Sequence, residues 1–129
     1  MKSKIAALSA ALATTCPMLA HSTEIALKCD TLKHHILIER LIDTQYTYRA
    51  WNKPKDTTQK PDLEISNGTV DLEGTGVCAT STYTFKKGNL EINVSDNVSC
   101  GDNTTPDNAS GDVSVSINGV QKAHYWCQK

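Results

Sequence analysis

The residues of this chain that could do chemistry do not form a known catalytic motif. His34 and His35, with Cys29 before them and His124 far downstream, are residue types that could ligate a metal. Adjacent residues of a strand point to opposite faces, however, whereas a metal needs ligands that converge. The sequence contains no G-x-S-x-G motif, and no cysteine is expected to stay reduced beside a histidine. We therefore expect no catalytic residue, no metal site and no cofactor.

One local cluster of side chains exceeds what the composition predicts. Arg49 and Trp51 stand at alternate positions and so share one face of a strand. Arg and Trp are frequent anchors of protein interfaces, since they combine a large contact area with directional hydrogen bonds. The candidate protein-binding residues are Arg49, Trp51, Lys53, Lys55 and Lys60. In the alternative interpretation, Trp51 is a core residue at a strand end and the lysines only solvate a loop.

The cysteines indicate an oxidising compartment. Beyond the N-terminal apolar segment the chain holds four of them, an even number that is typical of disulfides in a short exported protein. Four cysteines allow three pairings. We favour Cys29–Cys127, which would join the first strand to the last, and Cys78–Cys100, which would tie a long loop to the central hairpin.

Residues 1–22 are typical of a secretory signal peptide that is cleaved from the mature protein. Lys2 and Lys4 supply positive charge, an uncharged apolar segment follows, and Ala20-His21-Ser22 fits a small-x-small cleavage site. The apolar segment is shorter than the roughly 20 residues that a transmembrane helix needs. We expect residues 23–129 to be a single domain, periplasmic or secreted and not membrane-spanning.

The charge of the chain argues against nucleic acid as a partner. Cleavage of the signal peptide would remove two of the 13 basic residues, and the 11 that remain against 14 acidic ones give a net charge of −3. A nucleic-acid-binding domain needs a basic face to neutralise phosphates. We expect another exported protein as the partner, and a monomer or homodimer.

Alternation of apolar and polar residues predicts strands through most of the domain. The expected strands are 23–29, 45–51, 63–66, 69–73, 77–85, 90–95 and the two arms of a hairpin over 111–127. Residues 36–43 have apolar residues at helical spacing but isoleucines that favour a strand, and we favour the strand. About eight or nine short strands predict an all-β fold, an antiparallel meander that closes into a small barrel, with a β-sandwich as the alternative.

Two Asn-Gly pairs predict type I′ hairpin turns, because both central positions of that turn need a positive φ. Asn67-Gly68 would separate strands 63–66 and 69–73, and Asn118-Gly119 would turn the C-terminal hairpin. Near the C-terminus, Tyr125 and Trp126 must face opposite sides of a strand. We expect Trp126 to face inward.

In outline, the two ends of the domain resemble the small periplasmic inhibitors of C-type lysozyme. These are exported β-barrels of about this size, with one cysteine in the first strand and another in the last. The resemblance rests on Cys29 and on the final Tyr125-Trp126-Cys127. The signature loop of that family, Ser-Gly followed by an aromatic residue and later a Lys-Gly turn, is not reproduced, because Asp112 follows Ser110-Gly111 and Lys87-Gly88 precedes it. No site residue is transferred from the family.

These patterns together lead us to expect a non-enzymatic protein-binding module. It would act as an inhibitor or immunity protein against a cell-wall hydrolase of the lysozyme type or against a toxin. A small-ligand-binding β-barrel is the alternative, and an open apolar cavity would support it. A small hydrolase without a recognisable motif is a weaker alternative, since paired carboxylates can lie anywhere in a sequence.

Overall fold

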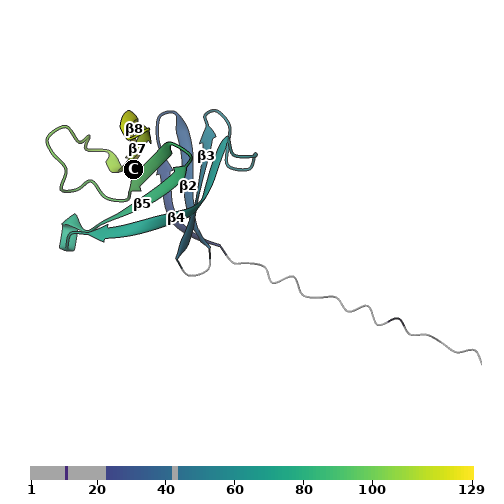
Figure 1. Cartoon of the computed structure of the whole chain (residues 1–129). Helices are drawn as coiled ribbons and strands as arrows, with labels where there is room; N and C mark the ends of the chain where they lie inside the picture. The colour runs from purple at the N-terminus through teal and green to yellow at the C-terminus, as the bar shows by residue number, and fades with distance from the viewer. Residues whose placement is uncertain (1–10, 12–22, 42–43) are drawn as a thin grey trace, which may run out of the picture.

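The computed structural model of the chain describes Ala11 and residues 23–41 and 44–129 (Figure 1). The predicted signal peptide, apart from Ala11, lies outside the described residues. So do residues 42 and 43, the last two of the segment whose secondary structure the sequence leaves ambiguous.

Eight antiparallel strands follow one another in a meander, and each strand pairs with the next along the chain. The strands are β1 Glu24–Asp30, β2 His34–Leu41, β3 Gln45–Asn52, β4 Leu63–Glu73, β5 Thr80–Lys87, β6 Leu90–Ser95, β7 Ala109–Ile117 and β8 Val120–Gln128. Within the described residues the only helical element is a 3-10 turn, Gly76–Cys78. The predicted all-β antiparallel meander is confirmed, and the sheet curls into a half-barrel (Figure 1).

The ambiguous segment is a strand as far as the structure describes it. Ile36 and Ile38 of β2 are buried in the core, whereas Leu37 between them is only half-buried. Period-two burial of this kind is the pattern of a strand with one face on the core. No helix of the described part of the chain is long and apolar enough to cross a membrane.

The prediction of a hairpin at Asn67-Gly68 is wrong. Residues 63–73 form one strand, β4, which pairs first with β3 and then with β5. Asn67 has a positive φ of 60°, but Gly68 does not, so a type I′ turn is not formed. Tyr46 of β3 faces Gly68 and Tyr48 faces Ile65, so β4 carries one extra residue there, a β-bulge. The bulge bends a single strand around the barrel, which accounts for eight strands where nine were possible.

The hairpin predicted at Asn118-Gly119 is confirmed. Both residues have positive φ, 51° and 77°, as a type I′ turn requires. The backbone amide of Asn118 also donates to the carbonyl oxygen of Asn89 at 3.0 Å, so the β5–β6 and β7–β8 turns lie side by side.

The hydrophobic core lies on the concave face of the sheet. Its most deeply buried members come from both halves of the meander and include Ile38, Phe85, Ile92, Val94 and Val113. The ring of Phe85 packs directly over Gly68, where an added Cβ would lie 2.2 Å from the Cε1 atom of that ring. Gly68 is thus required by packing rather than by a turn.

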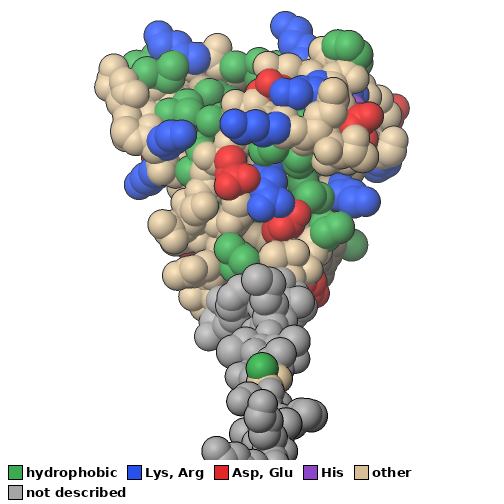
Figure 2. Space-filling model, turned by 90° about the vertical axis from the view of Figure 1, so that its right-hand side faces the viewer, with side chains coloured by type: hydrophobic (Ala, Val, Ile, Leu, Met, Phe, Trp, Pro, Cys, Tyr) green, Lys and Arg blue, Asp and Glu red, His purple; other side chains and the backbone are tan. Residues whose placement is uncertain are grey.

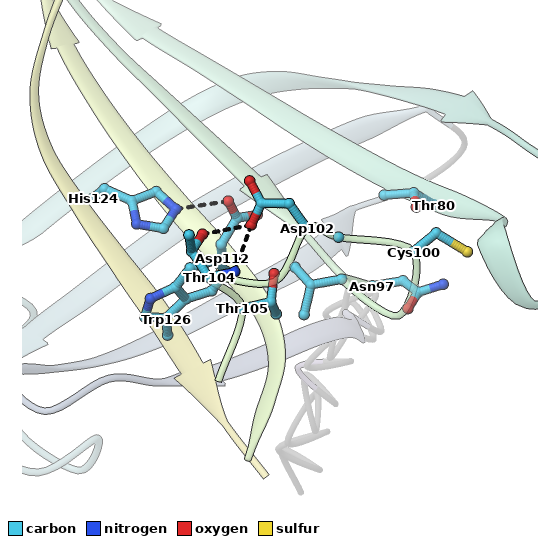
Figure 3. A pocket seen from close by; sticks show the side chains of 11 residues that line it. Thr80, Asn97, Cys100, Asp102, Thr104, Thr105, Asp112, His124 and Trp126 are labelled. Atoms are coloured by element: carbon cyan, nitrogen blue, oxygen red, sulfur yellow. Dashed lines mark hydrogen bonds and ion pairs between the residues drawn. The ribbon is translucent and has the colours of Figure 1, made fainter. Parts of the chain in front are cut away.

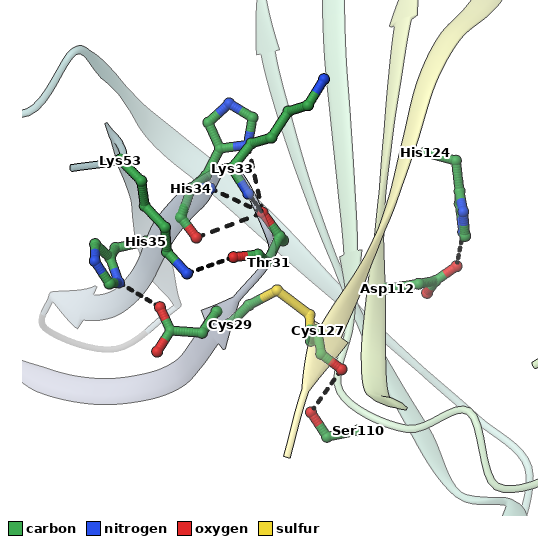
Figure 4. The surroundings of a disulfide bond; sticks show 11 residues. Cys29, Thr31, Lys33, His34, His35, Lys53, Ser110, Asp112, His124 and Cys127 are labelled. Atoms are coloured by element: carbon green, nitrogen blue, oxygen red, sulfur yellow. Dashed lines mark hydrogen bonds and ion pairs between the residues drawn. A yellow bond between two sulfur atoms is a disulfide. The ribbon is translucent and has the colours of Figure 1, made fainter. Parts of the chain in front are cut away.

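Both predicted disulfides are present. Cys29 of β1 bonds to Cys127 of β8, with Cα atoms 4.9 Å apart (Figure 4). Cys78 of the 3-10 turn bonds to Cys100 in the connection between β6 and β7. No backbone ladder pairs β8 with β1 among the described residues, so the half-barrel is held shut by a covalent bond between its edges. Two disulfides fit an oxidising compartment outside the cytoplasm.

The expectation that Trp126 faces inward is wrong. Cys127 is 1% exposed within the core, because it must meet Cys29 there. Residues two apart in a strand share a face, so Tyr125 faces the core with Cys127 and Trp126 faces outward. Tyr125 accordingly packs against the core cluster, and Trp126 contacts the ring of His124 on the outer surface.

Removing the disulfide between the edge strands should destabilise the fold more than removing the other one. The two bonds span 98 and 22 residues of chain, and the chain-entropy relation predicts losses of about 4.7 and about 3.4 kcal/mol in the free energy of unfolding. Urea unfolding of Cys29→Ala/Cys127→Ala and of Cys78→Ala/Cys100→Ala measures both. An equal or reversed order would contradict the role assigned to the edge disulfide.

Gly68→Ala should lower the free energy of unfolding by about 1–3 kcal/mol, because the new methyl group overlaps the ring of Phe85 and overpacks the core. The matched control is Ser66→Ala, an exposed position two residues earlier on the same strand. We expect that control to shift the urea midpoint little. A stable Gly68→Ala variant would show that Phe85 can move aside.

Candidate functional site

The connection between β3 and β4, residues 53–62, is the most heavily bonded loop of the barrel end that carries the β1–β2 turn. At its start, the Lys53 amide donates to the carbonyl oxygen of Lys33 at 2.9 Å. At its end, a carboxylate oxygen of Asp62 accepts from the Asn52 amide at 2.7 Å, and the Asp62 amide donates to the carbonyl oxygen of Ala50 at 2.9 Å. The loop is therefore closed at its base by backbone and carboxylate bonds and projects as a fixed unit.

Trp51 holds the middle of the loop. Its side chain is 3% exposed, but it lies on the face of β3 opposite the core residues Tyr48 and Ala50. The indole Nε1–H donates to the carbonyl oxygen of Gln59 at 2.7 Å. Trp51 is thus buried as the alternative interpretation expected, but beneath the loop on the outside of the barrel. Its role is to seat the loop rather than to contact a partner directly.

A second set of bonds stiffens the tip of the loop. Asp56 accepts from the backbone amide of Thr58 at 2.9 Å and from its hydroxyl, and these bonds hold the pKa of the Asp56 carboxyl below its usual range. The Asp56 amide in turn donates to the side-chain oxygen of Gln59 at 3.1 Å. Carboxylates that accept such bonds favour the ordered turn, as in other Asx turns.

The three loop lysines differ in what they contact. The Lys53 ammonium donates to the carbonyl oxygen of Thr31 at 2.6 Å (Figure 4). Lys55 pairs with Asp62 at 3.1 Å. Together with the Asn52 amide, which contributes most, Lys55 lowers the pKa of the Asp62 carboxyl. Lys60 is exposed and has no ion-pair partner among the described residues. Lys60 is therefore the loop cation that can meet another molecule without first losing a partner.

Arg49 shares the outer face of β3 with Trp51, as predicted, but it is not part of the loop. Its Nε atom pairs with Glu64 on β4 at 2.8 Å and its Nη1 atom with Glu39 on β2 at 3.1 Å. Two carboxylates on the neighbouring strands thus hold the guanidinium group flat against the sheet. The structure brings Trp51, Lys53 and Lys55 together in one assembly and leaves Arg49 in a separate, neutralised cross-strand network.

Side chains of both charges lie over the upper, broader part of the molecule on the face shown in Figure 2. Lysine and arginine side chains stand there among hydrophobic side chains, with several acidic side chains between them.

A surface groove of about 530 Å³ lies on the outer face of β8, beside the β6–β7 connection (Figure 3). His124 contacts Asp112 there, with Nε2 and Oδ2 2.8 Å apart, and its ring stands edge-on against Trp126. Asp102 accepts from the amide and hydroxyl of Thr104, which lower the pKa of its carboxyl. Each carboxylate already has a partner, and no hydroxyl or thiol contacts His124 within the described residues. The groove does not show a nucleophile–base pair.

The histidines considered as metal ligands do not converge. His35 contacts Asp30 across β1 and β2, whereas the ring of His34 lies against Tyr125 inside the barrel end. Cys29 is in a disulfide. In the part of the chain that the structure describes, no group of three or more His, Cys, Asp or Glu side chains could hold a metal ion.

The barrel interior also holds an apolar cavity of about 220 Å³ that the sequence patterns did not point to. Tyr48, Tyr125 and His34 reach it from the strands around it. The sequence could have indicated this cavity through Cys127: a cysteine that bonds to the first strand must face inward, and alternation then places Tyr125 inside as well.

Comparisons of the chain with models of known protein families, with curated proteins and with solved structures found no match.

Trp51→Phe should loosen the loop without unfolding the barrel. The substitution keeps an aromatic ring but removes the indole donor to Gln59, a bond whose loss typically costs about 1 kcal/mol. Hydrogen exchange of the loop amides should become faster, while exchange of core amides in β5 and β6 changes little. Trp126→Phe is the matched control, since Trp126 does not contact this loop. Unchanged exchange at residues 55–59 in Trp51→Phe would contradict the seating role of the indole.

Proposed function

We propose that this protein is an exported, non-enzymatic binding module that inhibits or neutralises another exported protein, a cell-wall hydrolase of the lysozyme type or a toxin. The observation that carries the proposal is the loop 53–62, which is exposed but fixed at its base, middle and tip by the bonds described above. A loop ordered before binding loses little conformational freedom in a complex, and so more of its contact energy appears as affinity.

The chemistry of the loop suits a cleft that contains carboxylates. Glycoside hydrolases place two carboxyl groups on either side of the scissile bond, and retaining enzymes hold them only about 5 Å apart. A lysine ammonium entering such a cleft would pair with both groups and exclude substrate. Within the described part of the chain, Lys60 is the exposed loop cation without an ion-pair partner, and the neighbouring Pro61 limits the backbone of the loop on its C-terminal side.

The rest of the molecule supports a binding role in an oxidising environment. The Cys78–Cys100 disulfide ties down the other long connection, residues 96–108, so that it also presents an ordered surface. The pairs His124–Asp112 and His35–Asp30 each consist of a base and a carboxylate with no nucleophile in contact among the described residues. These features favour recognition over chemistry.

The proposal is tested by mixing the full chain, with both disulfides formed, with a panel of muramidases, amidases and secreted toxins. We expect a 1:1 complex and loss of hydrolase activity for at least one acidic-cleft enzyme. Lys60→Glu should weaken inhibition of that enzyme at least about tenfold, roughly 1.4 kcal/mol, because the substituted carboxylate is repelled by the cleft.

The matched control is Lys129→Glu, at the end of the chain beyond β8, which should inhibit like the native protein. Hydrogen exchange of the loop amides in Lys60→Glu verifies that the loop remains ordered. A broad panel without any complex, or equal inhibition by Lys60→Glu and the native chain, would overturn the proposal.

A further inference from the structure

The concave side of the half-barrel is not filled at the end where the β5–β6 and β7–β8 turns lie. The cavity of about 220 Å³ is bounded there by Ile36, Leu63, Leu90 and Val115, and two further inward positions, Ala50 and Ala123, are alanines. Elsewhere the concave face is packed by large side chains such as Phe85. Small residues at these inward positions, rather than a strand missing from the sheet, leave the space open.

Four polar residues line this apolar cavity, His34, Tyr48, Asn52 and Tyr125. The ring of His34 stands edge-on against that of Tyr125, with ring centroids 5.0 Å apart, and Tyr48 lies nearby on β3. Burial lowers the pKa of the His34 imidazole, with the charge of Lys33 as a further cause, and burial raises the pKa of the Tyr48 phenol. Both groups are therefore neutral near pH 7 and can exchange hydrogen bonds with a ligand.

The two phenol groups are available to a ligand. Among the described residues, neither the Tyr48 nor the Tyr125 hydroxyl has a hydrogen-bond partner. No fully buried side-chain polar atom lacks a partner in that part of the chain. The hydroxyl of Tyr48, a residue only 4% exposed, must then reach open space, and the cavity is the space that it lines.

A lysine without an ion-pair partner among the described residues stands next to the lining of the cavity. Lys87 is the last residue of β5 and lies two residues after the inward Phe85, on the same face of the strand. It pairs directly with Leu90, which lines the cavity. It has no ion-pair partner among the described residues, whereas its neighbour Lys86 points to the other face and lies 3.9 Å from Glu91. Asp62, whose charge also reaches His34, is already held by Lys55.

We propose that the cavity binds a small amphiphile with a single negative head group, such as a medium-chain carboxylate. The alkyl chain would lie among the aliphatic side chains, and the head group would lie at the mouth beside Lys87 and the tyrosine hydroxyls. An apolar cavity of about 150 Å³ holds benzene, with six carbons. By that measure the space of about 220 Å³ accommodates about nine carbons. The inference does not rest on the proposed function, because the ligand enters the barrel and the loop 53–62 is not required for it.

The test is a titration of the full, disulfide-bonded, isotope-labelled chain with octanoate, followed by amide and methyl chemical shifts. We expect saturable shifts at residues that line the cavity. Affinity should rise about fourfold for each methylene from butanoate to octanoate, because each added methylene group leaves water. It should then level off when the cavity is full. Octylamine, which has the same chain and the opposite charge, should bind at least about tenfold more weakly.

Two variants separate the cavity from the charge. Ala123→Phe fills the cavity and should abolish the octanoate shifts. Lys87→Ala should weaken octanoate binding several-fold and leave octanol binding unchanged, and Lys86→Ala, on the opposite face of β5, is its matched control.

The proposal is overturned by any of three results: no saturable shift at the cavity up to about 10 mM octanoate, a range that covers even weak millimolar binding; equal binding of octylamine; or unchanged binding by Ala123→Phe. If Ala123→Phe fails to fold, the positions of the shifted residues in the native chain decide the question. Inhibition of a hydrolase in the panel experiment has no bearing on this result, so the two proposals can fail separately.

Discussion

The covalent bond between Cys29 and Cys127 is the constraint on which the rest of the structure depends. A meander of eight strands has two open edges, and unpaired edges are a liability in any sheet. Here the first and last strands are joined through side chains rather than through a backbone ladder. Both cysteines must point inward to meet, so the bond also decides which residues of β1 and β8 face the core. The curl of the sheet and the identity of its lining follow from one contact.

The closure of the barrel in this way leaves it incompletely filled. One part of the concave face is packed by Phe85 over Gly68, with no room for a methyl group between them. In another part of that face, alanines and the inward tyrosines leave an apolar space, and Lys87 pairs with Leu90 of its lining. The bulge at Asn67 links the two regions, because it bends β4 so that one strand serves both halves of the sheet.

On the outer surface of the barrel, Trp51 and Arg49 of β3 have different structural roles. The large aromatic side chain of Trp51 packs beneath the loop 53–62 and not in the barrel core. It is 3% exposed in that position. The loop it seats carries cations of which most are already bonded within the chain, so in the proposed binding role its fixed shape would matter as much as its charge. Arg49, next to it in the sequence pattern, is neutralised by Glu39 and Glu64 and stabilises the sheet instead.

The sequence by itself determined the fold class, the C-terminal hairpin at Asn118-Gly119 and the strand character of most segments, because these depend on local alternation and on turn chemistry. It left three cysteine pairings open, and only the tertiary structure decides for the favoured one, Cys29–Cys127 with Cys78–Cys100. It did not determine the path of β4, since Asn-Gly suits a bulge as well as a hairpin and only the position of Phe85 selects between them. It also did not reveal the inward face of Tyr125, the cover over Trp51 or the cavity. Those depend on the register between strands far apart in the chain and on how the volumes of side chains from six strands add up, and only the tertiary structure brings these residues together.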